Sequence, residues 1–118
     1  MKRTFFSLAL LLAVATLTAQ TKMTAREAAV KIADRILAST TYEFKTTKTG
    51  EIYKSVKKLP LDMDVKVACK YNNWHYTNGV TNMALMELGD KLGDKKYEKY
   101  VLKNMNFVFN EGNLDFFR

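Results

Sequence analysis

Large, partly polar rings are concentrated in one short segment, YNNWHYTNGV at residues 71–80. Trp74, the chain's one tryptophan, is followed directly by its one histidine, His75, and then by Tyr76. If residues 74–76 are extended, Trp74 and Tyr76 point to one side and His75 to the other. A Trp/Tyr pair beside a helix N-terminus is suited to binding a sugar ring and an anionic group. The alternative is an aromatic plug that packs the preceding connection onto the helices, and the residues alone favour the plug.

The other groups capable of chemistry carry weaker signals. Asp62 and Asp64 form an Asp-x-Asp pair, but no third ligand accompanies them, so turn or capping roles are favoured over a metal site. Cys69 is the single cysteine, which excludes an internal disulfide framework and is typical of a small buried side chain. No nucleophile–base arrangement with His75 can be argued from the sequence.

The N-terminus has the pattern of a secretory signal peptide over residues 1–19. Lys2 and Arg3 precede an apolar run at residues 5–15, and Ala19 closes a small-residue cleavage site. The run is short for a membrane span and polar sequence follows it, although a retained N-terminal anchor is the alternative. We therefore expect an exported protein, periplasmic or extracellular, whose mature domain covers residues 20–118 and has no membrane contact after cleavage.

The chain is basic, with 19 basic and 12 acidic side chains and a formal net charge of +7. An exported chain is not expected to meet nucleic acid as its normal partner. An anionic polysaccharide is a candidate partner, but a mild lysine surplus often only keeps a protein soluble, and that interpretation is favoured.

The first predicted helix covers residues 24–38, because apolar side chains recur there at helical period. Thr24 and Glu27 have the spacing of a capping box. A second helix is predicted from about Gly79 to Leu92, with Asn78 as its N-cap. It is apolar over a wide arc, as expected of a helix buried among several others.

A third helix is predicted over about residues 95–109. Gly93 suits a left-handed C-cap for the preceding helix, and Asp94 can cap the helix that follows. The two helices therefore form a hairpin with a short turn. After them, Leu114, Phe116 and Phe117 stand in the terminal segment with no later element to cover them, which indicates a chain stopped partway through a larger fold.

The segment between the first two helices, residues 39–73, has no helical pattern. TYEFK and EIYKSV could form short strands with a turn near Gly50. We interpret the region instead as a long irregular connection, which in a compact domain is often functional or incompletely packed.

The segment YNNWHYTNGVTNMALMELGDKLGDKKYEKYV resembles the N-terminal part of the unsaturated uronyl hydrolases of glycoside hydrolase families 88 and 105. It looks in particular like the unsaturated rhamnogalacturonyl hydrolases of pectin-degrading bacteria. The resembling elements are the W-x-Y-x-N-G start at Trp74, Tyr76, Asn78 and Gly79, the apolar helix after it, and the GDKKY turn. The preceding SVKKLPLDMDVKVACKYNN is also similar, and the resemblance covers about residues 24–118.

This resemblance implies an all-α fold, the N-terminal portion of an (α/α)6 barrel of six helical hairpins, incomplete in this chain. Enzymes of these families remove a terminal 4,5-unsaturated uronic acid from oligosaccharides left by polysaccharide lyases. An aspartate protonates the C4–C5 double bond and assists attack of water at C5, with no metal or organic cofactor. The catalytic aspartates belong to later hairpins, expected beyond residue 118, so no catalytic residue is assigned within the chain.

The implied substrate-binding residues are Trp74 and Tyr76, at the barrel mouth beside the unsaturated sugar, with Asn78 fixing the start of the helix. The expected partners are an unsaturated uronic-acid oligosaccharide and the missing C-terminal hairpins. We expect the chain itself to be inactive. The alternative function is a non-enzymatic, exported helical module that binds carbohydrate or protein.

Overall fold

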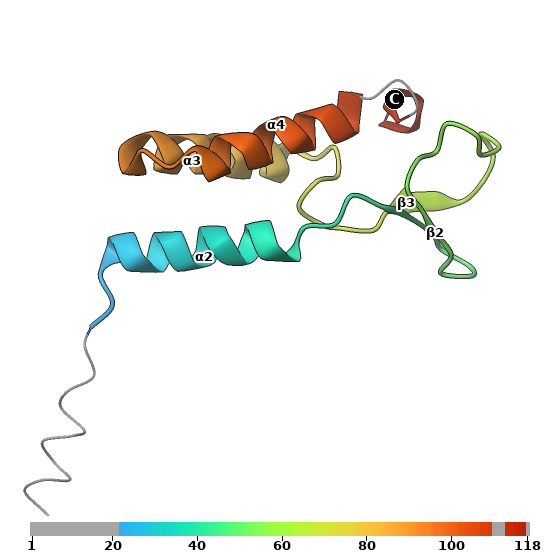
Figure 1. Ribbon diagram of the computed structural model, residues 1–118. Helices are drawn as coiled ribbons and strands as arrows, with labels where there is room; N and C mark the ends of the chain where they lie inside the picture. The colour runs from blue at the N-terminus through green and yellow to red at the C-terminus, as the bar shows by residue number, and fades with distance from the viewer. Residues whose placement is uncertain (1–21, 110–112, 118) are drawn as a thin grey trace, which may run out of the picture.

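The computed structural model describes residues 22–109 and 113–117. The predicted signal peptide and its cleavage site therefore lie outside the described residues. The elements follow the order α2 (Ala25–Ser39), β1 (Phe44–Thr46), β2 (Ile52–Tyr53), β3 (Val65–Val67), α3 (Tyr76–Leu92), α4 (Lys95–Phe109) and the 3-10 helix η1 (Leu114–Phe117). In Figure 1, α3 and α4 lie side by side, α2 forms a separate layer, and the strands lie beyond the helix ends.

The predicted first helix is confirmed as α2. Thr24 is its N-cap and completes the predicted capping box. The Glu27 backbone N–H donates to Thr24 Oγ1 at 3.2 Å, and Glu27 Oε2 accepts from the Thr24 N–H at 2.8 Å. Two backbone donors at the helix start are thus satisfied by neighbouring side chains.

The predicted hairpin is confirmed as α3 and α4. Gly93 adopts the left-handed conformation with φ of 66°, and Asp94 Oδ1 accepts a hydrogen bond from the Lys96 N–H at 3.0 Å. Gly89 allows the two helices to approach closely. A Cβ atom at this position would lie 3.0 Å from Asp94 O and 3.2 Å from Tyr97 Cβ.

The all-α prediction is wrong, because residues 39–73 contain a three-stranded antiparallel sheet of order β2-β1-β3. Phe44 in the central strand lies opposite Tyr53 on one side and Val67 on the other. Gly50, with φ of 73°, makes the turn between β1 and β2. The segment favours strands because backbone pairing satisfies its N–H and C=O groups beside an aromatic core.

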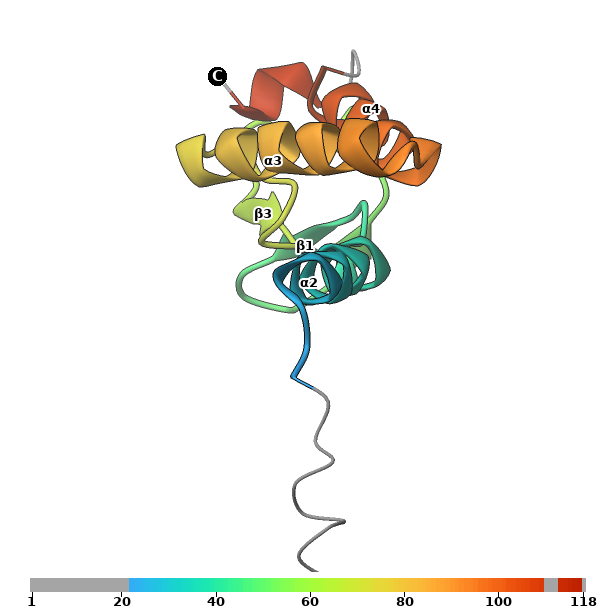
Figure 2. The same cartoon turned by 90° about the vertical axis from the view of Figure 1, so that its left-hand side faces the viewer.

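The prediction of an (α/α)6 barrel is wrong as well. Within the described residues the chain forms one helical hairpin, and α2 is followed by the sheet instead of a second helix. Figure 2 shows α2 end-on, with the hairpin as a layer above it. A toroid requires successive hairpins in a ring, and the described part of the chain does not have this arrangement.

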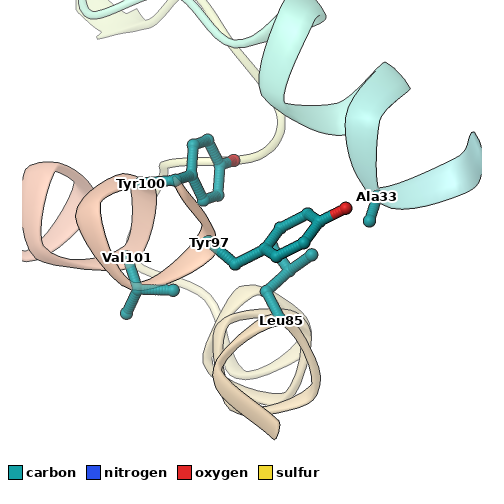
Figure 3. Close-up of a cluster of buried hydrophobic side chains, with 5 residues drawn as sticks. All are labelled: Ala33, Leu85, Tyr97, Tyr100 and Val101. Carbon is teal, nitrogen blue, oxygen red and sulfur yellow. The ribbon is translucent and has the colours of Figure 1, made fainter. Parts of the chain in front are cut away.

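Two groups of side chains hold these layers together. The first lies between α2 and the hairpin and consists of Ala33, Leu85, Tyr97, Tyr100 and Val101 (Figure 3). The second lies between the sheet and the end of α4, where the ring of Phe44 stacks on that of Phe107 at a centroid distance of 5.1 Å. The Phe116 ring contacts Phe44 edge-on at 5.2 Å. The sheet therefore covers Phe116 of the terminal segment, for which the sequence predicted no covering element.

Polar contacts also fasten α2 to α4. The Tyr97 hydroxyl donates to Asp34 Oδ1 at 2.8 Å, and Lys96 Nζ lies 2.9 Å from the same oxygen. In Figure 3 the Tyr97 ring reaches from α4 toward α2. The hydrogen bond from Lys96, and secondly that from Tyr97, lowers the pKa of Asp34. Farther along the same interface, the hydroxyls of Thr40 and Tyr100 are 2.8 Å apart.

Candidate functional site

A pocket of about 390 Å³ opens where the loop before α3 meets α3 and α4. We call it the aromatic–amide pocket; it is lined by residues 71–76, 78–80, 82, 83, 104, 105 and 108. Its lining combines tyrosine and tryptophan rings, asparagine amides, and the aliphatic side chains of both hairpin helices. The sequence-predicted residues Trp74, Tyr76 and Asn78 all belong to it.

The two predicted binding rings are accessible. Trp74 is 59% exposed and Tyr76 is 82% exposed, so neither ring forms a buried plug. The Trp74 ring rests with its edge on Phe109, at a centroid distance of 5.5 Å and an interplanar angle of 76°. Trp74 and Tyr76 were expected to point to one side and His75 to the other, and this arrangement is not observed. Tyr76 is already helical, and all three side chains line the pocket.

His75, not Asn78, is the N-cap of α3, which corrects the sequence prediction. His75 Nδ1 accepts from the Thr77 N–H at 3.4 Å and hydrogen-bonds with the Thr77 hydroxyl at 2.9 Å. Its backbone carbonyl accepts from the N–H groups of Asn78 and Gly79, at 3.0 and 3.3 Å. His75 thus accepts hydrogen bonds from three backbone N–H groups at the start of the helix.

Asn78 has a different role, one turn inside the helix. It is buried, and its Nδ2 donates to the carbonyl oxygens of Lys70 and Asn73 at 2.9 and 3.1 Å. These bonds fix the loop that carries Trp74. Asn78 therefore shapes the pocket by holding its aromatic wall in place.

A hydrogen-bond network stands behind the inner wall of the pocket; the bond between Asn82 and Asn104 is buried and the bond to Tyr42 is partly buried. Asn104 Nδ2 donates to Asn82 Oδ1 at 3.0 Å, and the Tyr42 hydroxyl donates to Asn104 Oδ1 at 2.9 Å. Burial raises the pKa of Tyr42 to about 12, so this hydroxyl remains a donor at neutral pH. The network joins α3, α4 and the segment before β1 through side chains whose orientations are fixed.

Asn72 provides a hydrogen-bond acceptor without a partner. Its side chain is 2% exposed, and its Nδ2 donates to the Thr41 carbonyl at 2.6 Å. Within the described residues, Oδ1 has no hydrogen-bond partner. Buried acceptors are nearly always paired, so Asn72 Oδ1 is an exception among the described residues.

Sequence reasoning missed the role of Asn72, Asn82 and Asn104. One signal was present. Asn78 and Asn82 are four residues apart, and therefore on one face, in a helix that is otherwise mostly apolar. Asn72 and Asn104 carried no such signal, because only the folded chain brings them to the same pocket.

Among the described residues that line the pocket, there is no aspartate, glutamate, lysine or arginine. The described lining therefore lacks the carboxyl pair that general acid–base chemistry on a sugar uses. Asp64 Oδ2 accepts a hydrogen bond from the Thr47 hydroxyl between β1 and β3, away from this lining. Among residues 22–109 and 113–117, no three histidine, cysteine or carboxylate side chains are grouped to hold a metal ion.

Comparisons with protein-family models, with curated proteins and with solved structures find no significant match to this chain. The resemblance to unsaturated uronyl hydrolases rests on the residues quoted above. In the part of the chain that the structure describes, no helix is both long enough and apolar enough to cross a membrane.

Proposed function

We propose that the aromatic–amide pocket binds a sugar unit of an oligosaccharide. The accessible rings of Trp74 and Tyr76, next to a cavity lined by amides, are the observation that carries this proposal. The faces of pyranose rings are apolar and pack on aromatic side chains, while their hydroxyls require donors and acceptors around the edge. Trp74 and Tyr76 supply the first kind of contact, and asparagine amides supply the second.

The sequence resemblance makes the proposal more specific. The ligand is an oligosaccharide that a pectin-degrading lyase leaves with a terminal 4,5-unsaturated uronic acid. The chain acts outside the cytoplasm as the substrate-binding part of a hydrolase of that sugar. The hydration step needs a carboxylic acid, and none lies among the described residues that line the pocket. The pocket residues therefore bind and orient the oligosaccharide, and we assign them no proton transfer.

The single tryptophan provides a direct binding assay, because all indole emission comes from the pocket wall. Titration with lyase-generated rhamnogalacturonan oligosaccharides should shift the emission to shorter wavelength and saturate, as the sugar displaces water from the ring. Tyr76→Ala should weaken binding about fivefold, from loss of about 1 kcal/mol of ring contact. Leu61→Ala is the control, because Leu61 is 96% exposed and does not line the pocket.

The same oligosaccharides distinguish binding from turnover. Hydration removes the ultraviolet absorbance of the C4–C5 double bond, which is conjugated with the carboxylate. We expect this absorbance to persist while tryptophan emission saturates, because the described part of the pocket lining has no carboxyl group. Consumption of the double bond by residues 20–118 would contradict this division of roles.

A non-enzymatic carbohydrate-binding module is the second candidate function. The uncharged pocket lining favours it, since binding requires rings and amides but no acid. A protein that binds oligosaccharides with saturated and unsaturated ends equally well would support this candidate over the hydrolase.

A further inference from the structure

The charge of the pocket restricts the sugar that it can bind. In the lining as far as the structure describes it, the ionisable groups are tyrosine hydroxyls and the imidazole of His75. Lys70 Nζ lies 5.0 Å from the centroid of the Tyr71 ring, but Lys70 does not line the pocket. A carboxylate moved from water into this lining would lose hydration without gaining a cation, which is costly.

The start of α3 offers little compensation for an anion. Helix N-termini attract anions through free backbone N–H groups. Here the N–H groups of Thr77, Asn78 and Gly79 already donate to His75. The anion-binding capacity that the sequence suggested for this helix end is therefore largely used within the chain.

We infer that the aromatic–amide pocket selects an uncharged pyranose unit and leaves the uronate carboxylate of the oligosaccharide outside. This inference rests on the proposed carbohydrate binding and specifies which unit of the ligand occupies the pocket. The uncharged unit that the pocket binds is then a different sugar from the unsaturated uronic acid that is hydrolysed.

Two probes that differ in charge test the inference. Trigalacturonate and its fully methyl-esterified form have the same rings and length, and titration calorimetry at about 0.15 M salt suppresses long-range attraction to the basic chain. The ester should bind at least about tenfold more tightly than the acid. Equal or tighter binding of the acid would overturn the inference. Lyase-generated oligosaccharides then separate the two claims. If they do not bind, the proposed function is wrong as well; if they bind, only the charge preference is wrong.

A substitution at the rim tests the electrostatic cause. Met83 lines the pocket and is 74% exposed, so Met83→Lys adds a cation there without disturbing the core. It should improve the ratio of acid to ester affinity about fivefold, since one exposed contact at close range contributes about 1 kcal/mol. Met83→Gln is the matched neutral control and should leave the ratio unchanged. An unchanged ratio in Met83→Lys would overturn the electrostatic argument.

Discussion

Asn104→Ala should destabilise the protein more than any other asparagine substitution on α4. Asn104 is 1% exposed and uses both ends of its amide, accepting from the Tyr42 hydroxyl and donating to Asn82 Oδ1. Truncation to alanine leaves both partners without a bond. It removes the link between the pocket wall and the segment before β1 at the same time.

The expected magnitude follows from those two partners. A buried polar group that loses its hydrogen-bond partner costs about 1–3 kcal/mol. Tyr42 is only half-buried, so its share is near the lower limit, whereas Asn82 is buried and carries the larger share. Alanine regains about 0.5 kcal/mol of helix propensity. The free energy of unfolding should therefore fall by about 2–4 kcal/mol.

Asn106→Ala provides the matched control, because Asn106 is exposed on the same helix and the substitution changes propensity alone. It should stabilise the protein by about 0.5 kcal/mol. Urea unfolding followed by circular dichroism measures both variants, with the slope checked for a common denatured state. If the free energies of unfolding of Asn104→Ala and Asn106→Ala agree within about 0.5 kcal/mol, the hydrogen-bond reasoning is refuted.

Three further predictions concern the helical layers. Gly93→Ala should lower the free energy of unfolding by about 1–2 kcal/mol, because φ is 66° there; Gly79→Ala, in open helical surroundings, should raise it by about 1 kcal/mol. Gly89→Ala should lower the free energy of unfolding by about 1 kcal/mol in thermal unfolding despite its propensity gain, because its Cβ atom would lie 3.0 Å from the backbone oxygen of Asp94, just before α4; a net gain would contradict the close approach. The lowered pKa of Asp34 adds stability above its ordinary value of 3.8, which is lost as pH falls through the folded-state pKa. The stability difference between wild type and Asp34→Asn should therefore shrink on acidification, and a constant difference would exclude the Lys96 contact as its source.

The helices were predictable from local signals. The capping box at Thr24 and Glu27, the left-handed Gly93 and the cap at Asp94 each act within a few residues, and all are present as predicted. The N-cap of α3 was misassigned because asparagine is the commoner capping residue. His75 replaced it because its ring and carbonyl both reach the first turn.

The sheet was not predictable with the same rules. Its strands have two or three residues, too few for a clear alternating pattern. Phe44 pairs with Val67 across more than twenty intervening residues, so only tertiary packing sets the register. The aromatic cluster of Phe44, Phe107 and Phe116 provides that packing and gives the chain's last described residues a place in the fold.

The candidate site was predicted in part. Trp74 and Tyr76 stand out by residue type, and the structure places both at the rim of the pocket. The amide wall comes from three separate segments, which no local pattern connects. The uncharged lining is likewise a property of the folded pocket, since charged residues are frequent throughout the sequence.

The central claim, that residues 71–83 and their contacts on α4 form an oligosaccharide-binding site, is tested most directly by a backbone amide chemical-shift titration. The uniformly ¹⁵N-labelled chain would be titrated with lyase-generated rhamnogalacturonan oligosaccharides. We predict saturable shifts confined to residues 71–83 and 104–108, with the indole N–H of Trp74 among the largest. Saturable shifts located elsewhere, or none at millimolar sugar, would contradict the account.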